Sequence, residues 1–377
     1  MQAVPTVDFA PAIELLAVAS LSAAGVLAVW WWRQRRAGHG DRRIALAALA
    51  AFLTADLIVF GAFTRLTDSG LGCPDWPGCY GAASPWGASA HIDAAERAQP
   101  AGPVTVTKAW IEMIHRYLAM TVGALILALA VVLGRARASG PASAFAWAAL
   151  AWVLVQGLFG KYTVTLKLYP AVVTAHLLGG MVLLGLLMAQ LEALRQAPRL
   201  TAARGAAWVL ALVVAQIALG GWVSSNYAVL ACRGFPQCNG EWWPLADYAA
   251  GFTLLRQLGR AGGEGYVSFE ALVAIQMVHR LFAAVVVGAV LALAWRLWRD
   301  RGEVARRAAA MLVGLLVLQL LSGLSNVLLD WPMLAALLHT TGAACFVALL
   351  VVLVMRARPQ RAAATAVIEG ALRRHHA

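Results

Sequence analysis

Four of the eight histidines in this sequence lie within long apolar stretches. They form two pairs, His115 with His176 and His279 with His339, and the two members of each pair are about 60 residues apart. An ionisable side chain within an apolar segment is costly to bury and usually has a functional role. Four histidines at matched positions therefore favour a metal site over four separate structural hydrogen bonds.

The surroundings of these histidines indicate which metal they would bind. A zinc site normally brings cysteine or carboxylate ligands at short spacing, as in His-Glu-x-x-His or Cys-x-x-Cys. Here each pair supplies only two imidazoles, from different predicted helices, and two axial imidazoles from facing helices suit a b-type haem iron. The sequence contains no Cys-x-x-Cys-His motif, which argues against a covalently attached c-type haem. We therefore predict a haem iron at each pair.

The two pairs differ in the residue that precedes the first histidine by one helical turn. Glu112 stands three residues before His115, whereas the second pair has Gln276 at the corresponding place. A carboxylate near a haem can move protons or stabilise positive charge, and an amide cannot. This difference predicts a reacting site in the first half and a stable redox haem in the second. The alternative is a structural role, in which Glu112 pairs with an arginine or a lysine, such as Lys108 or Lys161.

An arginine directly follows the first histidine of each pair. Arg116 and Arg280 could contact haem propionates, because a guanidinium binds carboxylates through paired hydrogen bonds. Alternatively, each side chain could reach toward the membrane surface or pair with a carboxylate in a loop. Both readings place these arginines near the outer ends of their helices.

Two cysteine pairs lie just beyond predicted helix ends. Cys73 is separated from Cys79, and Cys232 from Cys238, by the same short spacing. On an oxidising side of a membrane, such pairs favour local disulfides. Zinc is a weaker alternative, since no further histidine or cysteine lies nearby in sequence. The disulfides could be structural or could exchange with an outer-side thioredoxin-like partner.

Landmarks of the first half recur in the second. The segment Gly61–Gly81 corresponds to Gly220–Gly240 with both cysteine pairs aligned, and the histidines follow at nearly the same offset of about 160 residues. Internal repeats are common in membrane proteins and tend to place function between the repeats. We predict two pseudo-symmetric four-helix bundles. They would have parallel orientations because each contains an even number of spans.

The composition requires a membrane protein. Hydrophobic residues make up 61% of the chain and charged residues only 13%, and several uncharged runs are long enough to cross a bilayer as helices. The sequence thus predicts an all-α polytopic membrane protein. The first of its predicted spans has no counterpart in the repeat and is read as an extra N-terminal transmembrane helix rather than a cleaved signal peptide, since no positive charge precedes it. The spans are predicted at about 11–32, 43–64, 109–133, 143–163, 171–194, 205–225, 269–297, 305–328 and 333–355.

The distribution of positive charge predicts the orientation. Of the 30 lysines and arginines, 20 lie in connections on one side of the predicted spans, which the positive-inside rule makes cytoplasmic. The N-terminus is then outside and the C-terminus inside. The net charge of +12 is accordingly a topology signal and not a nucleic-acid site. The long connections 65–108 and 226–268 both fall outside, where we expect short interfacial helices.

These boundaries divide the chain into four predicted parts. An N-terminal anchor helix and linker precede two four-helix repeats, and a basic cytoplasmic tail follows them. The parts are 1–42, 43–200, 201–356 and 357–377.

Over about 43–356 the chain resembles the haem A synthases, which convert haem O to haem A for cytochrome oxidase assembly. The resemblance rests on the segment from Thr64 to Cys79, TRLTDSGLGCPDWPGC, and on the motifs EMIHR at 112–116 and QMVHR at 276–280. The positions of His176 and His339 complete it. Each motif lies in the helix or outer loop where that family has it.

The resemblance implies a role for each site residue. His279 and His339 would hold haem b as cofactor, His115 and His176 would hold the substrate haem O, and Glu112 would be catalytic. The reaction would oxidise a haem methyl group to a formyl group by successive hydroxylations, with loss of water from a gem-diol. The family setting is the cell inner membrane, with haem O delivered by an upstream synthase and electrons passed to or from an unidentified partner.

Two other functions fit the histidines. One is a dihaem b-type electron-transfer protein, and the other is a haem transporter or chaperone. The electron-transfer reading leaves the difference between Glu112 and Gln276 unexplained. Formation of a new haem product separates an enzyme from both alternatives.

Overall fold

The structure is a computed structural model that describes residues 10–37, 41–135, 140–261 and 265–357. Nearly all of the predicted basic tail, from residue 358 on, lies outside the described residues. Within these ranges the chain is helical and contains no β-strand, as predicted for an all-α protein.

Nine helices in the described ranges are long and apolar enough to cross a membrane. The predicted spans are therefore confirmed, and their ends agree to within a few residues. The chain is a multi-pass membrane protein. The nine helices are α1 (Ala10–Ala37), α2 (Arg42–Leu66), α4 (Val106–Arg135), α5 (Pro141–Thr165), α6 (Pro170–Arg195), α7 (Ala206–Ser225), α9 (Phe269–Arg299), α10 (Glu303–Leu328) and α11 (Met333–Ala357).

Local sequence explains where several of these helices begin. Pro141 and Pro170 stand in the first turn of α5 and α6, where proline lacks no needed donor and its fixed φ suits a helix. The Asp41 side chain caps α2 by accepting a hydrogen bond from the Arg43 N–H at 2.8 Å. The Arg43 guanidinium also donates to this carboxylate, which holds the pKa of Asp41 below its usual range. Ser268 caps α9 through the Ala271 N–H.

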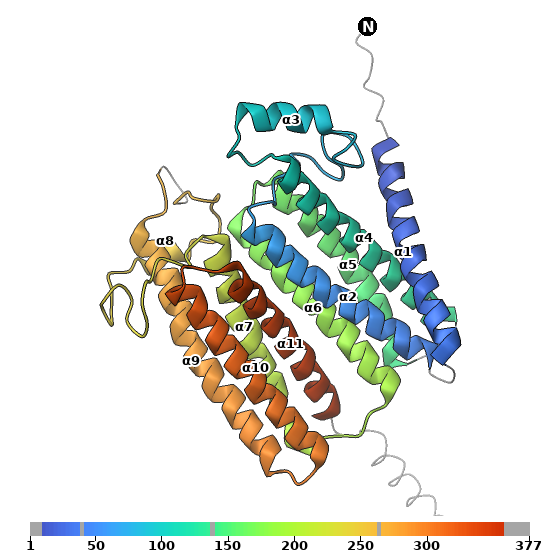
Figure 1. Cartoon of the computed structure of the whole chain (residues 1–377). Helices are drawn as coiled ribbons and strands as arrows, with labels where there is room; N and C mark the ends of the chain where they lie inside the picture. The colour runs from blue at the N-terminus through green and yellow to red at the C-terminus, as the bar shows by residue number, and fades with distance from the viewer. Residues whose placement is uncertain (1–9, 38–40, 136–139, 262–264, 358–377) are drawn as a thin grey trace, which may run out of the picture.

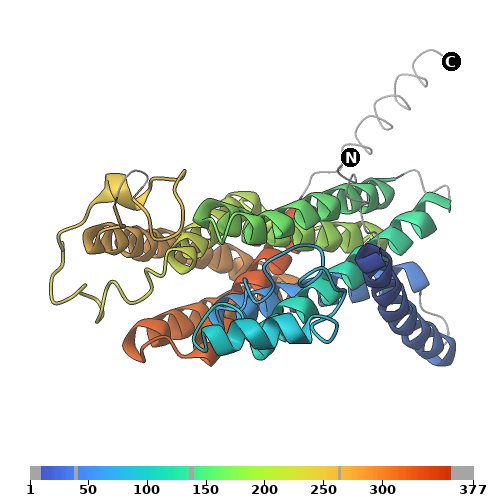
Figure 2. The same ribbon diagram turned by 90° about the horizontal axis from the view of Figure 1, so that it is seen from above.

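The spanning helices form two groups that lie side by side (Figures 1 and 2). In the first group α2 contacts α4, α4 contacts α5, α5 contacts α6, and α6 closes the ring on α2. In the second group α7, α9, α10 and α11 contact one another in the same order. Helices α6 and α11 pack together between the groups, α6 also contacts α7, and α11 contacts α2. The arrangement is that of two four-helix bundles, while their origin as an internal repeat stays a prediction. Helix α1 packs outside the first group, on α4.

A continuous apolar core runs through both groups. Its fully buried members include Leu129 of α4, Leu187 of α6, Leu297 of α9 and Leu350 of α11. Small residues of α2, such as Ala47, are also fully buried, and small residues let neighbouring helix backbones approach closely in membranes. This core fixes the helices that carry the four histidines.

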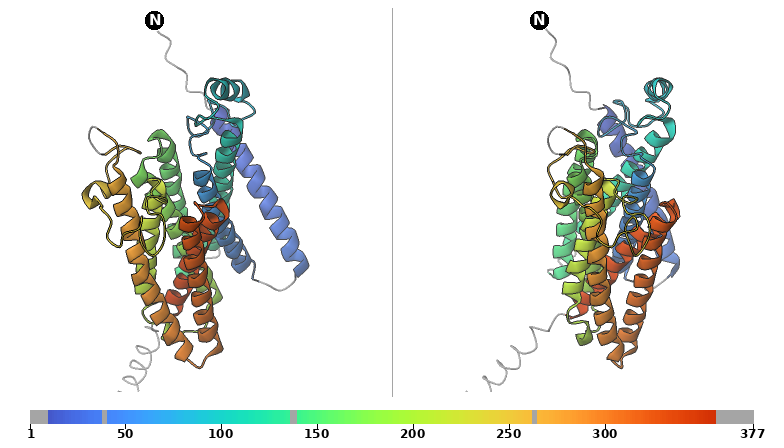
Figure 3. Two further views of the ribbon diagram at one scale, coloured as in Figure 1. Left: turned by 60° about the vertical axis from the view of Figure 1, so that its left-hand side comes forward. Right: turned by 90° about the vertical axis from the view of Figure 1, so that its left-hand side faces the viewer.

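Both long connections leave the bundles at the same end (Figure 3). The first contains α3 (Ser89–Ala98), which contacts α4, and the second contains α8 (Tyr248–Gly251), which contacts α9. The short helices expected in these connections are thus present. At the opposite end a short 3₁₀ helix, η1 (Thr201–Ala203), joins α6 to α7.

Candidate functional site

Each of the four histidines in the bundles lies against a glycine of a neighbouring helix. In the first bundle, a Cβ added to Gly61 of α2 would lie 3.1 Å from His115 Nε2, and one added to Gly160 of α5 would lie 3.7 Å from His176 Cε1. The missing side chain at each glycine is what lets the imidazole approach the helix backbone. The backbones of α2 and α5 therefore form the support behind the two rings.

The second bundle has the same arrangement. A Cβ on Gly220 of α7 would lie 3.1 Å from His279 Cε1, and one on Gly323 of α10 would lie 3.1 Å from His339 Cε1. These four glycines are site residues that the sequence reasoning missed. A signal was available, because Gly61 and Gly220 begin the two repeated segments.

The structure brings together the histidines of each predicted pair. His115 is close enough to His176, and His279 to His339, for the two imidazoles of each pair to interact electrostatically. His176 has a buried ring nitrogen, Nδ1, with no hydrogen-bond partner among the described residues. Two half-buried imidazoles that face each other from different helices are a donor set that fits a haem iron.

A hydrogen bond favours one tautomer of His339. The Ser322 hydroxyl lies 3.0 Å from His339 Nδ1 and donates its own proton to the Leu318 carbonyl at 2.6 Å. The hydroxyl oxygen is then an acceptor for an Nδ1–H, which leaves the Nε2 lone pair free for a metal. Gln216 of α7 contacts His279 differently: its amide nitrogen, which is a donor, lies 3.1 Å from Nδ1 and also donates to the His279 carbonyl at 3.1 Å, so it orients the ring without favouring the tautomer seen at His339. The second pair is thus oriented by neighbouring side chains.

Glu112 is held in place by both its helix and the first long connection, 65–108. Its side chain is only 4% exposed. One carboxylate oxygen accepts the Cys73 backbone N–H at 2.8 Å, and the other pairs with Arg116, one turn further along α4. Glu112 therefore pairs with an arginine, as the structural alternative expected, but the partner is Arg116 and not Lys108 or Lys161. The carboxylate is fixed one turn from His115.

At the corresponding place in the second bundle, Gln276 makes only neutral contacts. Its amide nitrogen donates to the Val229 carbonyl at 3.1 Å, and its side chain is also 4% exposed. The two positions therefore have similar burial and differ in charge. The difference between a charged and a neutral side chain, which the sequence shows, therefore lies at equivalent buried positions of the two bundles, Glu112 and Gln276.

The two arginines that follow the histidines donate hydrogen bonds to the two long connections. Arg116 donates to the carbonyls of Pro77 and Gly78. Arg280 donates to three carbonyls of the second loop, those of Cys232, Gly234 and Gln237, at 2.7, 3.1 and 3.3 Å. Contacts of these two guanidinium groups with haem propionates stay a prediction.

Both predicted disulfides are present. The S–S distances are 2.08 Å for Cys73–Cys79 and 2.00 Å for Cys232–Cys238. In each loop the second cysteine pairs through its backbone with a residue three positions later, Ala82 or Glu241. The first disulfide loop contacts Glu112 through the Cys73 N–H, and the second packs against Val273 and Met277, which flank Gln276 on α9.

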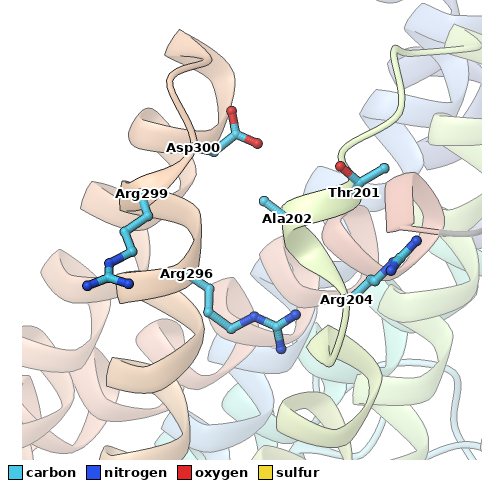
Figure 4. Close-up of a pocket in the computed structure, with 6 residues that line it drawn as sticks. All are labelled: Thr201, Ala202, Arg204, Arg296, Arg299 and Asp300. Carbon is cyan, nitrogen blue, oxygen red and sulfur yellow. The ribbon is translucent and has the colours of Figure 1, made fainter.

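A pocket lies at the far end of the second bundle, and its lining is basic (Figure 4). Arg296 extends toward the segment 201–204, whereas Arg299 points away from it. Arg299 follows His279 by 20 residues on α9, which corresponds to about 30 Å along a helix. The pocket is therefore separate from the histidine sites. It is lined by Thr201, Ala202, Arg204, Arg296, Arg299 and Asp300.

Fold and site together define a class: a multi-pass membrane protein of two four-helix bundles, each with a pair of glycine-backed histidines. Residues 44–351 match the family model described as cytochrome oxidase assembly protein. The chain is 37% identical over 315 residues to the heme A synthase of Shewanella oneidensis, covering 81% of this chain and 94% of that protein. It is 27% identical over 325 residues to that of Maricaulis maris, covering 78% and 90%. The heme A synthase of Brucella ovis is 28% identical over 347 residues, covering 80% and 90%. The chain therefore belongs to the haem A synthase family, and the resemblance seen in its motifs is confirmed.

Proposed function

We propose that this protein is a haem A synthase, an enzyme that oxidises a methyl group of haem O to the formyl group of haem A. Relatives of that name match most of the chain. The observation that carries the proposal is the buried carboxylate of Glu112 beside His115, where the second bundle has the neutral Gln276. A protein that only carried electrons would not require that difference.

The substrate haem O binds in the first bundle, with His115 and His176 as ligands to its iron. Both imidazoles are set against glycines, so their positions are limited by the backbones of α2 and α5. A ligand held at its iron from two helices has little freedom to rotate or slide. Fixed placement of the reacting group is itself a large part of catalysis.

Glu112 acts on the methyl group that is oxidised. Its carboxylate accepts a proton or stabilises positive charge that develops at that carbon during successive hydroxylations. The resulting gem-diol loses water to leave the formyl group. The Cys73 N–H and Arg116 hold the carboxylate in place before the reaction. Groups that are already oriented need no rearrangement when charge develops, which makes their stabilisation larger.

The second bundle holds haem b through His279 and His339. When bound there, this haem would store and transfer electrons. The chain's own contribution is orientation: Ser322 and Gln216 position the imidazoles, and Gln276 fills the place of Glu112 without a charge. The absence of a carboxylate at that position suits a haem that must stay chemically unchanged.

The predicted setting of the enzyme follows from the same proposal. The protein lies in the cell inner membrane with its N-terminus outside, and the disulfide loops face the outer side. Haem O arrives from an upstream synthase, and a separate electron-transfer partner completes the redox balance. A thiol–disulfide partner could reach the Cys73–Cys79 and Cys232–Cys238 loops. The first bundle, 43–200, is the substrate half and the second, 201–356, is the haem b half.

Mass analysis of haems extracted from membranes tests the function. The protein is produced in a host that makes haem O but no haem A, and His115→Ala serves as the matched inactive control. We expect the formyl product only with the unmodified protein. If haem B and haem O alone are recovered from a folded, haem-loaded protein supplied with an electron-transfer partner, the proposal is wrong. The dihaem electron-transfer function then takes its place.

A further inference from the structure

Arg256 is a buried cation in the second outer connection. Its side chain is only 2% exposed. One terminal nitrogen, Nη2, donates to the Asn226 Oδ1 at 2.5 Å, and the other donates to the Arg260 carbonyl at 3.2 Å. The guanidinium carbon also lies 5.7 Å from the centre of the Trp222 ring. All of these partners are neutral.

No anion balances this charge among the described residues. No Asp or Glu of the described ranges is within ion-pair distance of Arg256, and its Nε–H is buried there without a hydrogen-bond partner. Burial lowers the pKa of the Arg256 guanidinium, although the nearby Tyr169 phenol counteracts this effect. An arginine nevertheless remains charged at neutral pH. A buried, unpaired cation is strongly unfavourable, so the position calls for a bound anion.

The contacts of Arg256 place it past the level of His279 and His339, toward the end of the second bundle that carries the long connection. Asn226 caps the C-terminus of α7 and follows Gly220, which faces His279, by six residues. This separation corresponds to about 9 Å along the helix axis. Trp222 lies on the same helix between these two levels. The guanidinium is therefore on the outer side of the His279 and His339 pair.

We propose that Arg256 binds a propionate carboxylate of the haem held by His279 and His339. This inference rests on the haem b site proposed above. A guanidinium can bind a carboxylate through two parallel hydrogen bonds, and Arg256 has its Nε–H still free for one of them. Asn226 and the Arg260 carbonyl then orient the guanidinium group. The hydrogen bonds of Arg256 to Asn226 and to the Arg260 carbonyl both lie within the second bundle and its connection, which favours this haem over the substrate haem.

Binding of haem b and of its dimethyl ester to the full-length protein tests the inference without an activity assay. The protein is prepared without haem and carries His115→Ala, so that only the second site is titrated, by absorbance. We expect the acid to bind about tenfold or more tightly than the ester, since one charged hydrogen-bonded pair contributes at least this factor. Arg256→Gln should remove the preference, and Arg256→Lys should keep part of it. Arg233→Gln is the matched control, because Arg233 is an exposed arginine of the same connection, and it should keep all of the preference.

The outcomes distinguish a wrong assignment of Arg256 from a wrong assignment of the haem b site. An equal preference for the acid in Arg256→Gln and in the parent would overturn the assignment of the carboxylate. The same comparison is made in a His279→Ala protein whose first site is intact. If Arg256→Gln removes the preference for the acid there, the carboxylate belongs to the substrate haem, and the assignment to haem b is overturned. If Arg256→Gln does not fold, equal binding of acid and ester by the parent decides against the inference. Failure of His279→Ala to abolish binding in the His115→Ala protein would instead reject the haem b site itself.

Discussion

Glu112 and Gln276 occupy equivalent buried positions but differ in charge and in hydrogen bonding. Both lie one turn before a histidine and are equally buried, yet one accepts a backbone N–H and pairs with a cation while the other donates to a carbonyl. A buried carboxylate needs such partners, because an unpaired one would be strongly destabilised. Both oxygens of Glu112 are therefore engaged, one by the Cys73 N–H and the other by Arg116.

The glycine behind His279 should be essential for haem binding. In Gly220→Ala the new methyl group would lie 3.1 Å from the imidazole, so the ring must shift from its position. We expect haem b content to fall several-fold, measured by absorbance of the purified protein. Gly288→Ala on α9 is the control, because a Cβ there meets nothing within 4 Å. Normal haem content in Gly220→Ala would contradict the proposed support.

Helices α4 and α9 are each linked to a disulfide loop by the arginine that follows the histidine. Arg116 contacts the first loop and Arg280 the second. In the first bundle the loop also supplies the Cys73 N–H that holds Glu112. The loop is therefore part of the site and not only a connection.

Removal of the first disulfide should affect chemistry more than haem b binding. A disulfide that closes so short a loop restricts the unfolded chain by about 2 kcal/mol. In Cys73→Ser with Cys79→Ser, the Cys73 N–H loses its fixed position, and we expect formation of the formyl product to fall by about tenfold. Haem b absorbance should stay unchanged. The same double change at Cys232 and Cys238 is the matched control, expected to weaken the second bundle; equal product from the first double variant and the parent would contradict the prediction.

The helices could be predicted well because a membrane span has a simple signature. The apolar run at 269–297 became α9 at Phe269–Arg299, since about 20 apolar residues are needed to cross the bilayer. The histidine pairs could be found because their spacing repeats. The contacts of Arg116 with the first disulfide loop could not, since those partners are backbone carbonyls that any residue carries. The burial of Arg256 could not either, because it depends on Asn226 and Trp222, which are distant in sequence.

The two bundles are joined near both ends of their shared seam. Near the outer loops, Arg65 donates to the Ser224 carbonyl at 2.6 Å, and the Tyr227 hydroxyl donates to Asp68 at 2.6 Å. At the other end Glu192 of α6, with its side chain 3% exposed, accepts two hydrogen bonds from Arg356 of α11. These contacts fix how the two histidine sites lie relative to each other.

Loss of the charge on Glu192 should destabilise the whole molecule. Glu192→Gln leaves the partly buried Arg356 without its anion, and we expect the free energy of unfolding to fall by about 3 kcal/mol. Unfolding of the detergent-solubilised protein by heat or denaturant measures the change. Glu303→Gln removes an exposed ion pair with Arg307 and should change stability by less than about 1 kcal/mol. Equal effects of the two substitutions would show that the Glu192 pair does not join the bundles.

The central claim, that the first bundle reacts while the second holds a stable haem, is tested most directly by exchanging the residues that distinguish them. Haems extracted from membranes containing Glu112→Gln or Gln276→Glu are analysed by mass in a host that makes haem O. We predict that Glu112→Gln retains bound haem b but yields no formyl product, and that Gln276→Glu still yields it. Product at the parent level from Glu112→Gln would contradict the account.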